Sequence, residues 1–174
     1  MAVITVAFLY FMTLKLTGDA VLQPEKESGI DLEERTSAAS FNDDPLSLKD
    51  YTKVDINILP SKMVVAKNCT GIVMTTTTQK TYSIEKGVDK KVEIRPDEHD
   101  LITDILDFYG IKPIDARISR FSNDVYYAEI LLKENNRVLS LDAKPSDALA
   151  IAARLNIPVY MKTELLNKYG EKIC

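Results

Sequence analysis

Two carboxylates near the start of a predicted helix have the spacing of a metal-binding pair. Asp142 ends a short apolar run and Asp147 follows after Pro145. A strand ending at Asp142 and a helix beginning near Pro145 would let the intervening bend aim both side chains at one point. Mg²⁺ and Mn²⁺ prefer carboxylate oxygens, and such an ion activates water and neutralises charge on a phosphoryl group. The pair is a candidate divalent-metal site, although an acidic residue in a first helical turn is also explained by capping alone.

Further donors and acceptors accompany this pair. Ser146 and the free backbone N–H groups of the helix start suit an anionic oxygen, and Lys144 adds a positive charge. A second predicted helix begins near His99, the only histidine, whose imidazole could transfer protons if the two helix starts converge. Capping and solvated surface charge explain the same residues without catalysis, so this alternative stays open. The candidates are Asp142, Asp147, His99 and Asp100 for catalysis, with Asp142 and Asp147 also as metal ligands, and Lys144, Ser146 and Arg95 for substrate binding.

Two predicted helices must position these residues. Asp97 is a predicted cap with Asp100 three positions later, and Gly110 is a predicted stop. The apolar residues between them recur at helical spacing: Leu101, Ile102, Ile105, Leu106 and Tyr109. The second helix is predicted over 145–155, because Pro145 suits a first helical turn.

Alternating apolar residues predict the strands. They cover 54–58, 63–66, 71–77, 81–84, 91–94, 114–118, 126–132, 138–141 and 157–161. The turn Ser122-Asn123-Asp124 predicts a hairpin, and a short helix is predicted from Thr163 to near Gly170. Tyr126 and Tyr127 point to opposite faces of their strand, so one is expected in the core and the other is available for base stacking or packing. The sequence predicts an α+β fold: a largely antiparallel or mixed sheet of hairpins, two main helices and a short C-terminal helix.

Composition and charge indicate one folded domain. The chain has 174 residues, of which 45% are apolar and 28% charged, which suits one globular core. The net charge of −4 is uneven, because residues 21–50 hold 8 acidic against 3 basic residues and residues 51–174 hold 17 against 18. A near-neutral domain lacks the basic charge typical of non-specific nucleic-acid binders, which neither proves nor excludes a polynucleotide substrate. We expect a domain over 51–174 after an acidic flexible linker over 21–50.

The N-terminal segment and the cysteines give information on the cellular location of the protein. Residues 1–14 are almost wholly apolar but shorter than the roughly 20 residues of a spanning helix. Residues 1–20 are predicted to be a signal-like or anchor segment, with membrane attachment through residues 1–16 as one option and a mis-assigned start codon as another. Export or anchoring is favoured over a cytoplasmic location. Cys69 and Cys174 are the only cysteines; they are predicted to be free thiols, with one disulfide as the alternative in an exported protein.

Two stretches carry a family resemblance: Arg95-Pro96-Asp97-Glu98-His99-Asp100-Leu101 and Leu141-Asp142-Ala143-Lys144-Pro145-Ser146-Asp147-Ala148-Leu149-Ala150-Ile151-Ala152. They resemble the bifunctional nuclease family, in which Arg-Pro-x-Thr-His-Asp-Leu opens one helix and Asp-x-Arg-Pro-Ser-Asp-Ala-Ile-Ala opens another. The strand with Tyr126, Tyr127 and Ala128 and the run Ile157-Pro158-Val159-Tyr160 follow in family order. The resemblance covers about residues 94–170.

The resemblance implies a nuclease that hydrolyses DNA or RNA with Mg²⁺ or Mn²⁺. Three departures favour the alternative, a non-catalytic module that binds an anionic ligand or a protein. Glu98 replaces Thr, and Lys144 replaces Arg and so loses the planar fork that grips phosphate. The segment between Ile84 and Arg95 is interpreted as too short for the helix that the family has there. Hydrolysis of small nucleotides needs the same residues and stays open, and a homo-oligomer is expected because exposed sheet edges commonly pair.

Overall fold

The structure is a computed structural model that describes residues 44–174. The expected signal-like segment and most of the expected linker lie outside the described residues. The helices and strands are, in chain order, β1 (Tyr51–Leu59), β2 (Lys62–Lys67), β3 (Thr70–Thr75), α2 (Thr78–Val88), α3 (Glu98–Phe108), β4 (Lys112–Ser122), β5 (Val125–Glu134), β6 (Arg137–Ala143), α4 (Pro145–Leu155), β7 (Val159–Lys162), α5 (Thr163–Tyr169) and β8 (Glu171–Lys172). None of these helices is long and apolar enough to cross a membrane.

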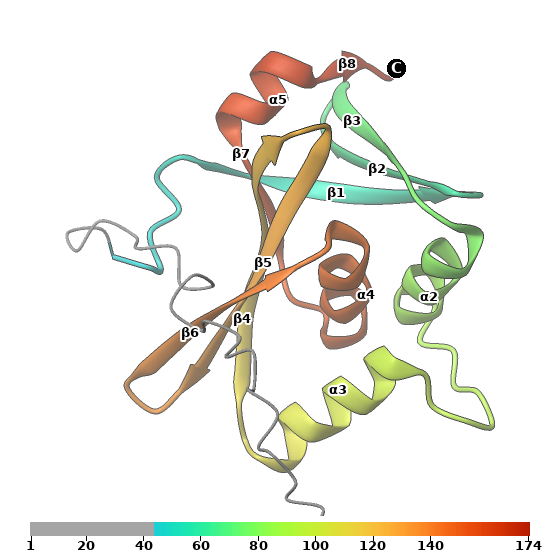
Figure 1. Cartoon of the computed structure of the whole chain (residues 1–174), viewed down its shortest axis with the longest axis vertical. Helices are drawn as coiled ribbons and strands as arrows, with labels where there is room; N and C mark the ends of the chain where they lie inside the picture. The colour runs from blue at the N-terminus through green and yellow to red at the C-terminus, as the bar shows by residue number, and fades with distance from the viewer. Residues whose placement is uncertain (1–43) are drawn as a thin grey trace, which may run out of the picture. The chain divides into compact units, whose positions relative to one another are not determined.

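The described strands form one mixed sheet in the order β6-β5-β4-β7-β1-β2-β3-β8 (Figure 1). All neighbours pair antiparallel except β4 and β7, which are parallel. Asn123 and Asp124 join β4 to β5 with φ angles of 51° and 59°, the left-handed backbone that two-residue hairpin turns favour. The predicted turn and the predicted α+β class are confirmed.

Helix α4 forms the centre of the core. It packs on β4 and β5, and its Leu149 and Ala150 are fully buried. Helix α2 lies against α4, with Gly87 at a close approach between them. A Cβ at that position would lie 2.9 Å from the Cβ of Ala153 and 3.0 Å from the backbone nitrogen of Arg154. The glycine therefore permits the close approach of the two helices.

Two of the predicted strands are wrong. Residues 81–84 belong to helix α2, because Thr77 caps this helix by accepting a hydrogen bond from the backbone N–H of Lys80. Residues 91–94 form neither helix nor strand, and Val92 and Ile94 are almost fully exposed. The threonines at residues 75–78 favour a strand. The buried side of α2 is largely polar, so the sequence shows no apolar stripe that would predict a helix there. The interpretation that a helix is missing before Arg95 is also wrong, since α2 occupies that place.

The prediction of free thiols is wrong as well. Cys69 and Cys174 form a disulfide, with their Cα atoms 5.2 Å apart. The short strand β8 pairs with Thr70 and Gly71 at the start of β3, which brings the C-terminus beside the β2–β3 turn. A separation of 105 residues hides this proximity in the sequence.

The sheet face opposite α4 holds a buried ion pair. Asp115 and Arg117 form two hydrogen bonds, of 2.8 and 3.0 Å, and both residues are buried. Arg117 also donates to the carbonyl oxygens of Pro45 and Ser47, at 3.0 and 3.3 Å. Part of the segment expected to be linker therefore contacts the sheet.

Candidate active site

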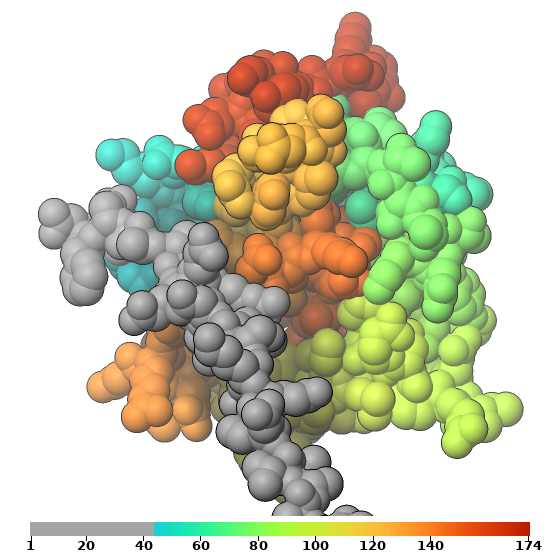
Figure 2. Space-filling view, viewed as in Figure 1, coloured from blue at the N-terminus to red at the C-terminus, as the bar shows by residue number. Residues whose placement is uncertain are grey.

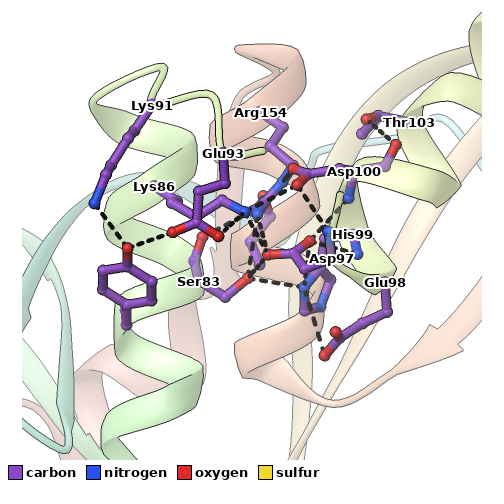
Figure 3. Close-up of polar contacts among 12 residues, drawn as sticks. Ser83, Lys86, Lys91, Glu93, Asp97, Glu98, His99, Asp100, Thr103 and Arg154 are labelled. Atoms are coloured by element: carbon purple, nitrogen blue, oxygen red, sulfur yellow. Dashed lines mark hydrogen bonds and ion pairs between the residues drawn. The ribbon is translucent and has the colours of Figure 1, made fainter. Parts of the chain in front are cut away.

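Helices α2, α3 and α4 meet around His99 (Figure 3). This residue lies in the first turn of α3 and is only 1% exposed. Its Nδ1 lies 2.9 Å from Oγ of Ser83 on α2, and its Nε2 lies 3.3 Å from Oδ1 of Asp147 on α4. The starts of the two motif helices therefore lie side by side, as the predicted site required.

A capping box sets the direction of His99. Asp97 Oδ1 accepts hydrogen bonds from the backbone N–H groups of His99 and Asp100, at 2.9 and 3.0 Å. Asp100 returns the contact by accepting from the Asp97 N–H at 3.0 Å. The predicted cap is confirmed, and it fixes the first turn of α3 against α2 and α4.

Lys80 of α2 links two carboxylates at the edge of this junction. Its Nζ lies 2.7 Å from Asp147 Oδ1 and 3.4 Å from Glu98 Oε1. The side chains of Lys80 and Asp147 are 30% and 29% exposed, so this pair, unlike His99, is accessible to a ligand. Glu98, which stands where the family motif has Thr, thus adds a hydrogen-bond acceptor for Lys80.

The charges around Asp147 keep it ionised. Burial alone would raise the pKa of Asp147, but the hydrogen bond and charge of Lys80, together with those of His99, hold this pKa below its ordinary value. The hydrogen bond with Asp147 in turn raises the pKa of Lys80. An anionic Asp147 beside a cationic Lys80 is therefore the state at neutral pH.

A second group of charges, here called the ion cluster, joins the same helices. It consists of Glu93, Asp97, Asp100, Lys86 and Arg154 (Figure 3). Lys86 Nζ lies 3.0 Å from Asp97 and 2.9 Å from Asp100, and Arg154 donates to the same two residues at 2.8 and 2.6 Å. Burial alone would raise the pKa of Asp100, but Arg154 and the other donors hold it far below its ordinary value. Asp100, a candidate for catalysis, is thus held between two cations.

The structure does not bring Asp142 to this junction. Asp142 lies directly across from Glu129 in the β5–β6 pairing, so their side chains share one face of the sheet. Glu129 contacts Tyr51 and Ser140 on the face opposite α4, whereas its neighbours Ala128 and Ile130 belong to the core that α4 covers. Asp142 and Asp147 therefore point to opposite sides of the sheet.

The three candidates for substrate binding lie near helix starts. Lys144 is the exposed N-cap of α4 and makes no side-chain capping bond, and Ser146 is buried in the first turn. Arg95 is exposed in the loop before α3. Among the described residues, neither Arg95 nor Lys144 takes part in a salt bridge.

The carboxylates present do not fit the expected metal site. Asp142 and Asp147 do not meet, and the closest group of donor atoms in the described part of the chain belongs to Asp97, Glu98 and His99. Both oxygens of Asp97 already accept several hydrogen bonds, and Nδ1 of His99 faces Ser83. The Asp97 and His99 atoms that could bind a metal ion already form hydrogen bonds within the protein. The group of Asp97, Glu98 and His99 therefore does not replace Asp142 and Asp147 as a set of metal ligands.

Sequence reasoning missed four contributors, namely Lys80, Ser83, Lys86 and Arg154. Three of them lie on α2, of which residues 81–84 were predicted as a strand and the rest as neither helix nor a candidate site. The cap at Thr77 was the signal that could have revealed this helix. Arg154 lies in the last turn of α4, where a basic residue is also explained by the helix dipole.

A cavity of about 510 Å³ adjoins the ion cluster. Lys86, Asp100 and Arg154 form part of its wall together with Lys90. Lys90 donates to the carbonyl oxygens of Ala153 and Arg154 at the end of α4. The charged groups of the wall are therefore largely paired with other parts of the protein.

The fold and the junction define an α+β domain in which two motif-bearing helices start side by side on a mixed sheet. The chain belongs to the bifunctional nuclease domain family, whose model matches residues 63–173. This match confirms the resemblance noted from the sequence.

Individual relatives match a shorter stretch. Two Mycobacterium tuberculosis proteins described as uncharacterized are 34% identical over 76 residues, which is 44% of this chain and 44% of theirs. "Bifunctional nuclease 1" of Oryza sativa is 28% identical over 82 residues, and "Bifunctional nuclease 2" of Arabidopsis thaliana is 27% identical over 82 residues. Each plant match covers 45% of this chain and 25% of the relative. The chain thus spans less than half the length of these curated relatives.

Proposed function

We propose that this chain hydrolyses phosphodiester bonds of DNA or RNA. Membership of the bifunctional nuclease domain family and the names of the plant relatives support this proposal. The observation that carries it is the position of Asp147, a partly exposed carboxylate where three helices meet, bonded to Lys80 and His99. A carboxylate can orient the attacking water and a cation can stabilise the charge of an anionic ester during its hydrolysis.

Asp147 is the proposed contact for the attacking water. Lys80 and His99 both bond to its Oδ1, and among the described residues no hydrogen bond occupies its Oδ2. Because its pKa is lowered, Asp147 is ionised at neutral pH, so Oδ2 can accept a hydrogen bond from water and orient it.

Lys80 is the proposed contact for the phosphodiester. Its ammonium group is partly exposed and held in place by Asp147 and Glu98. The start of α4 adds little to this role, because the N–H groups of Asp147 and Ala148 already donate to the carbonyl of Lys144 and Pro145 has none. The N–H of Ser146 is the first-turn donor that remains for a phosphate oxygen.

His99 is proposed to act as a positioning residue. It is almost fully buried, so it reaches substrate only through Asp147, and its two nitrogens link Asp147 to Ser83. Dependence on Mg²⁺ or Mn²⁺ remains a separate prediction, as do the roles assigned to Asp142, Asp100, Lys144 and Arg95.

The test is cleavage of plasmid DNA and single-stranded RNA by the purified full chain, with Mg²⁺, Mn²⁺ or a chelator. Asp147→Asn should lower the rate by about 100-fold or more. Asp104→Asn is the matched control, since Asp104 is exposed on α3 and forms no salt bridge among the described residues. Asp142→Asn tests the prediction made from sequence. Equal cleavage by all four proteins would indicate a contaminating nuclease and refute the proposal.

The second candidate function is a non-catalytic module that binds an anionic ligand or a protein. The extensive pairing of charges favours it, because Asp100 is held by Lys86 and Arg154 and His99 is buried. Lack of cleavage under all metal conditions, combined with binding of an oligonucleotide that Lys80→Gln abolishes, would support this second function.

A further inference from the structure

Helix α3 carries a large apolar surface that the described domain does not cover. Leu106 is the one apolar residue of this helix that is buried, and Phe108 is 82% exposed. The exposed apolar residues of the helix and its C-cap are Leu101, Ile102, Ile105, Phe108 and Tyr109. The apolar stripe noted in the sequence therefore mostly faces outward.

Helical geometry places this apolar surface on one flank of α3. Asp100 and Asp104 line the cavity beside Lys86, so the acidic flank faces α2. At about 100° per residue, Leu101 and Ile105 lie on average about 100° around the helix from Asp100 and Asp104, on a flank turned away from the cavity. Because α2 contacts β1 and β2 whereas α4 contacts β4 and β5, the flank away from α2 faces the β6 end of the sheet.

Strand β6 provides the other half of this surface. It is the last strand of the sheet at that end, so one of its edges has no strand beside it within the described part of the chain. Leu139 and Leu141 pair with Leu132 and Ile130, which belong to the core, so both lie on the helix-bearing face, yet they are 54% and 43% exposed. Between Val138 and Leu141 the strand has no proline and no charge, the usual protections of an edge.

The two halves lie on one face of the molecule. Figure 2 shows atoms of β6 and of α3 on the same side. Leu132, the partner of Leu139, also pairs with Pro113 of β4, which follows α3 after a short turn. The helix-bearing face of β6 and the apolar flank of α3 therefore border the same corner of the sheet.

The size of this surface suits a stable protein contact. The seven side chains, at 40–82% exposed, leave roughly 780 Å² of mostly apolar surface if each offers on the order of 200 Å². The largest patch on a typical monomer is about 300–600 Å², and each partner of a standard complex buries about 800 Å².

The charges of α3 indicate which kind of partner covers this apolar surface. Helix α3 carries Glu98, Asp100, Asp104 and Asp107 and no lysine or arginine, which disfavours anionic lipid and nucleic acid. An edge strand pairs most readily with a second strand edge, and that of an identical chain is self-complementary about a two-fold axis. A pairing centred on Ser140 would place Leu139 opposite Leu141 of the second copy.

We propose that this face is the interface of a homodimer, in which β6 pairs antiparallel with β6 of a second copy and the apolar flanks of α3 are buried. The two sheets then form one continuous sheet across the two-fold axis. The contact lies on the β6 side of α4, away from Lys80, so dimerisation leaves the proposed active site open. This dimer does not depend on the proposed function.

The test measures the mass of the full chain by light scattering and sedimentation over a range of concentrations. The wild type should have twice the chain mass, and Ile105→Asp and Leu139→Lys should each weaken dimerisation about 30-fold or more. Val73→Lys is the matched control, because Val73 is 45% exposed on β3, far from β6 in the sheet order, and should leave the dimer intact. A monomeric wild type, or a dimer unchanged in both variants, would overturn the proposal; the latter result would place the contact elsewhere, for example in residues 1–14.

A measurement on the wild type covers the case in which a variant fails to fold. Hydrogen exchange of the β6 amides should become faster when the protein is diluted, while exchange in β1, inside the sheet, should not change. Exchange of β6 that is independent of concentration across the dissociation range would contradict pairing of the edge strands.

Discussion

Nε2 of His99 lies 3.3 Å from Oδ1 of Asp147, and this contact joins the first turn of α3 to the first turn of α4. The two residues belong to different family motifs and are 48 positions apart. Because His99 is buried, its replacement would disturb both packing and chemistry. Lys80 bonds to the same oxygen from the partly exposed edge of the junction. Its replacement therefore tests the chemistry with less disturbance of packing.

Lys80→Gln should reduce nuclease activity without unfolding the protein. The substitution removes the cation that faces Asp147 and the proposed phosphate position, and loss of one such charge should lower kcat/KM by about 10- to 100-fold. The pair is about 30% exposed, so its loss should cost at most about 1 kcal/mol of stability. Lys62→Gln, at an exposed lysine of β2, is the control. Full activity in Lys80→Gln would remove Lys80 from the proposed site.

Acid should destabilise the domain through Asp97, Asp100 and Asp147. The folded-state pKa of each lies below its ordinary value. Below about pH 4 the unfolded chain therefore binds more protons than the folded one, and the stabilisation present above that pH is lost as the pH falls towards the folded pKa values. Urea unfolding midpoints should fall between pH 5 and pH 3. Asp100→Asn should flatten this dependence, and an equally steep slope in that variant would count against the ion cluster as its source.

Lys86→Met should destabilise the junction of the three helices. The side chain of Lys86 is 2% exposed, and its ammonium bonds to Glu93, Asp97 and Asp100. Methionine keeps the apolar stem but leaves Asp97 and Asp100 with Arg154 as their remaining cation and Glu93 without a salt bridge among the described residues. A fully enclosed pair would cost about 3–5 kcal/mol; here the adjoining cavity admits solvent, so we expect about 2 kcal/mol. Urea unfolding measures the loss, with Lys67→Met on the surface of β2 as the control; similar midpoints for both variants would contradict a structural role for Lys86.

Local signals predicted the parts of the fold that local interactions determine. The capping box at Asp97 and the hairpin turn at Asn123 were predicted correctly, because each depends on neighbours within a few positions. Helix α2 was missed because its buried side holds Thr81, Ser83 and Lys86, which become favourable only once α3 and α4 supply partners. A polar helix face of this kind carries no apolar period.

The candidate site was predicted only in part, because local signals place the helix starts but not the faces of the strands. The convergence of His99 and Asp147 was inferred from two helix starts and holds in the structure. The convergence of Asp142 and Asp147 does not, because the register of β6 against β5 decides the face on which Asp142 lies, and one position along a strand reverses that face. Such register depends on pairing between segments, which a single sequence does not reveal.

Loss of the disulfide between Cys69 and Cys174 should destabilise the domain and release its C-terminus. The bond closes a loop of 105 residues, for which the chain-entropy model gives about 4–5 kcal/mol, with less expected if the unfolded chain is compact. Strand β8 has two residues and pairs only with Thr70 and Gly71, so little else holds the chain end. The double variant Cys69→Ser/Cys174→Ser should unfold at lower urea, with faster hydrogen exchange over residues 170–174. A reductant should lower the wild-type midpoint to that of the double variant and leave the variant unchanged; a wild type insensitive to reduction, with both thiols shown to be free, would mean that pairing of β8 alone holds the C-terminus.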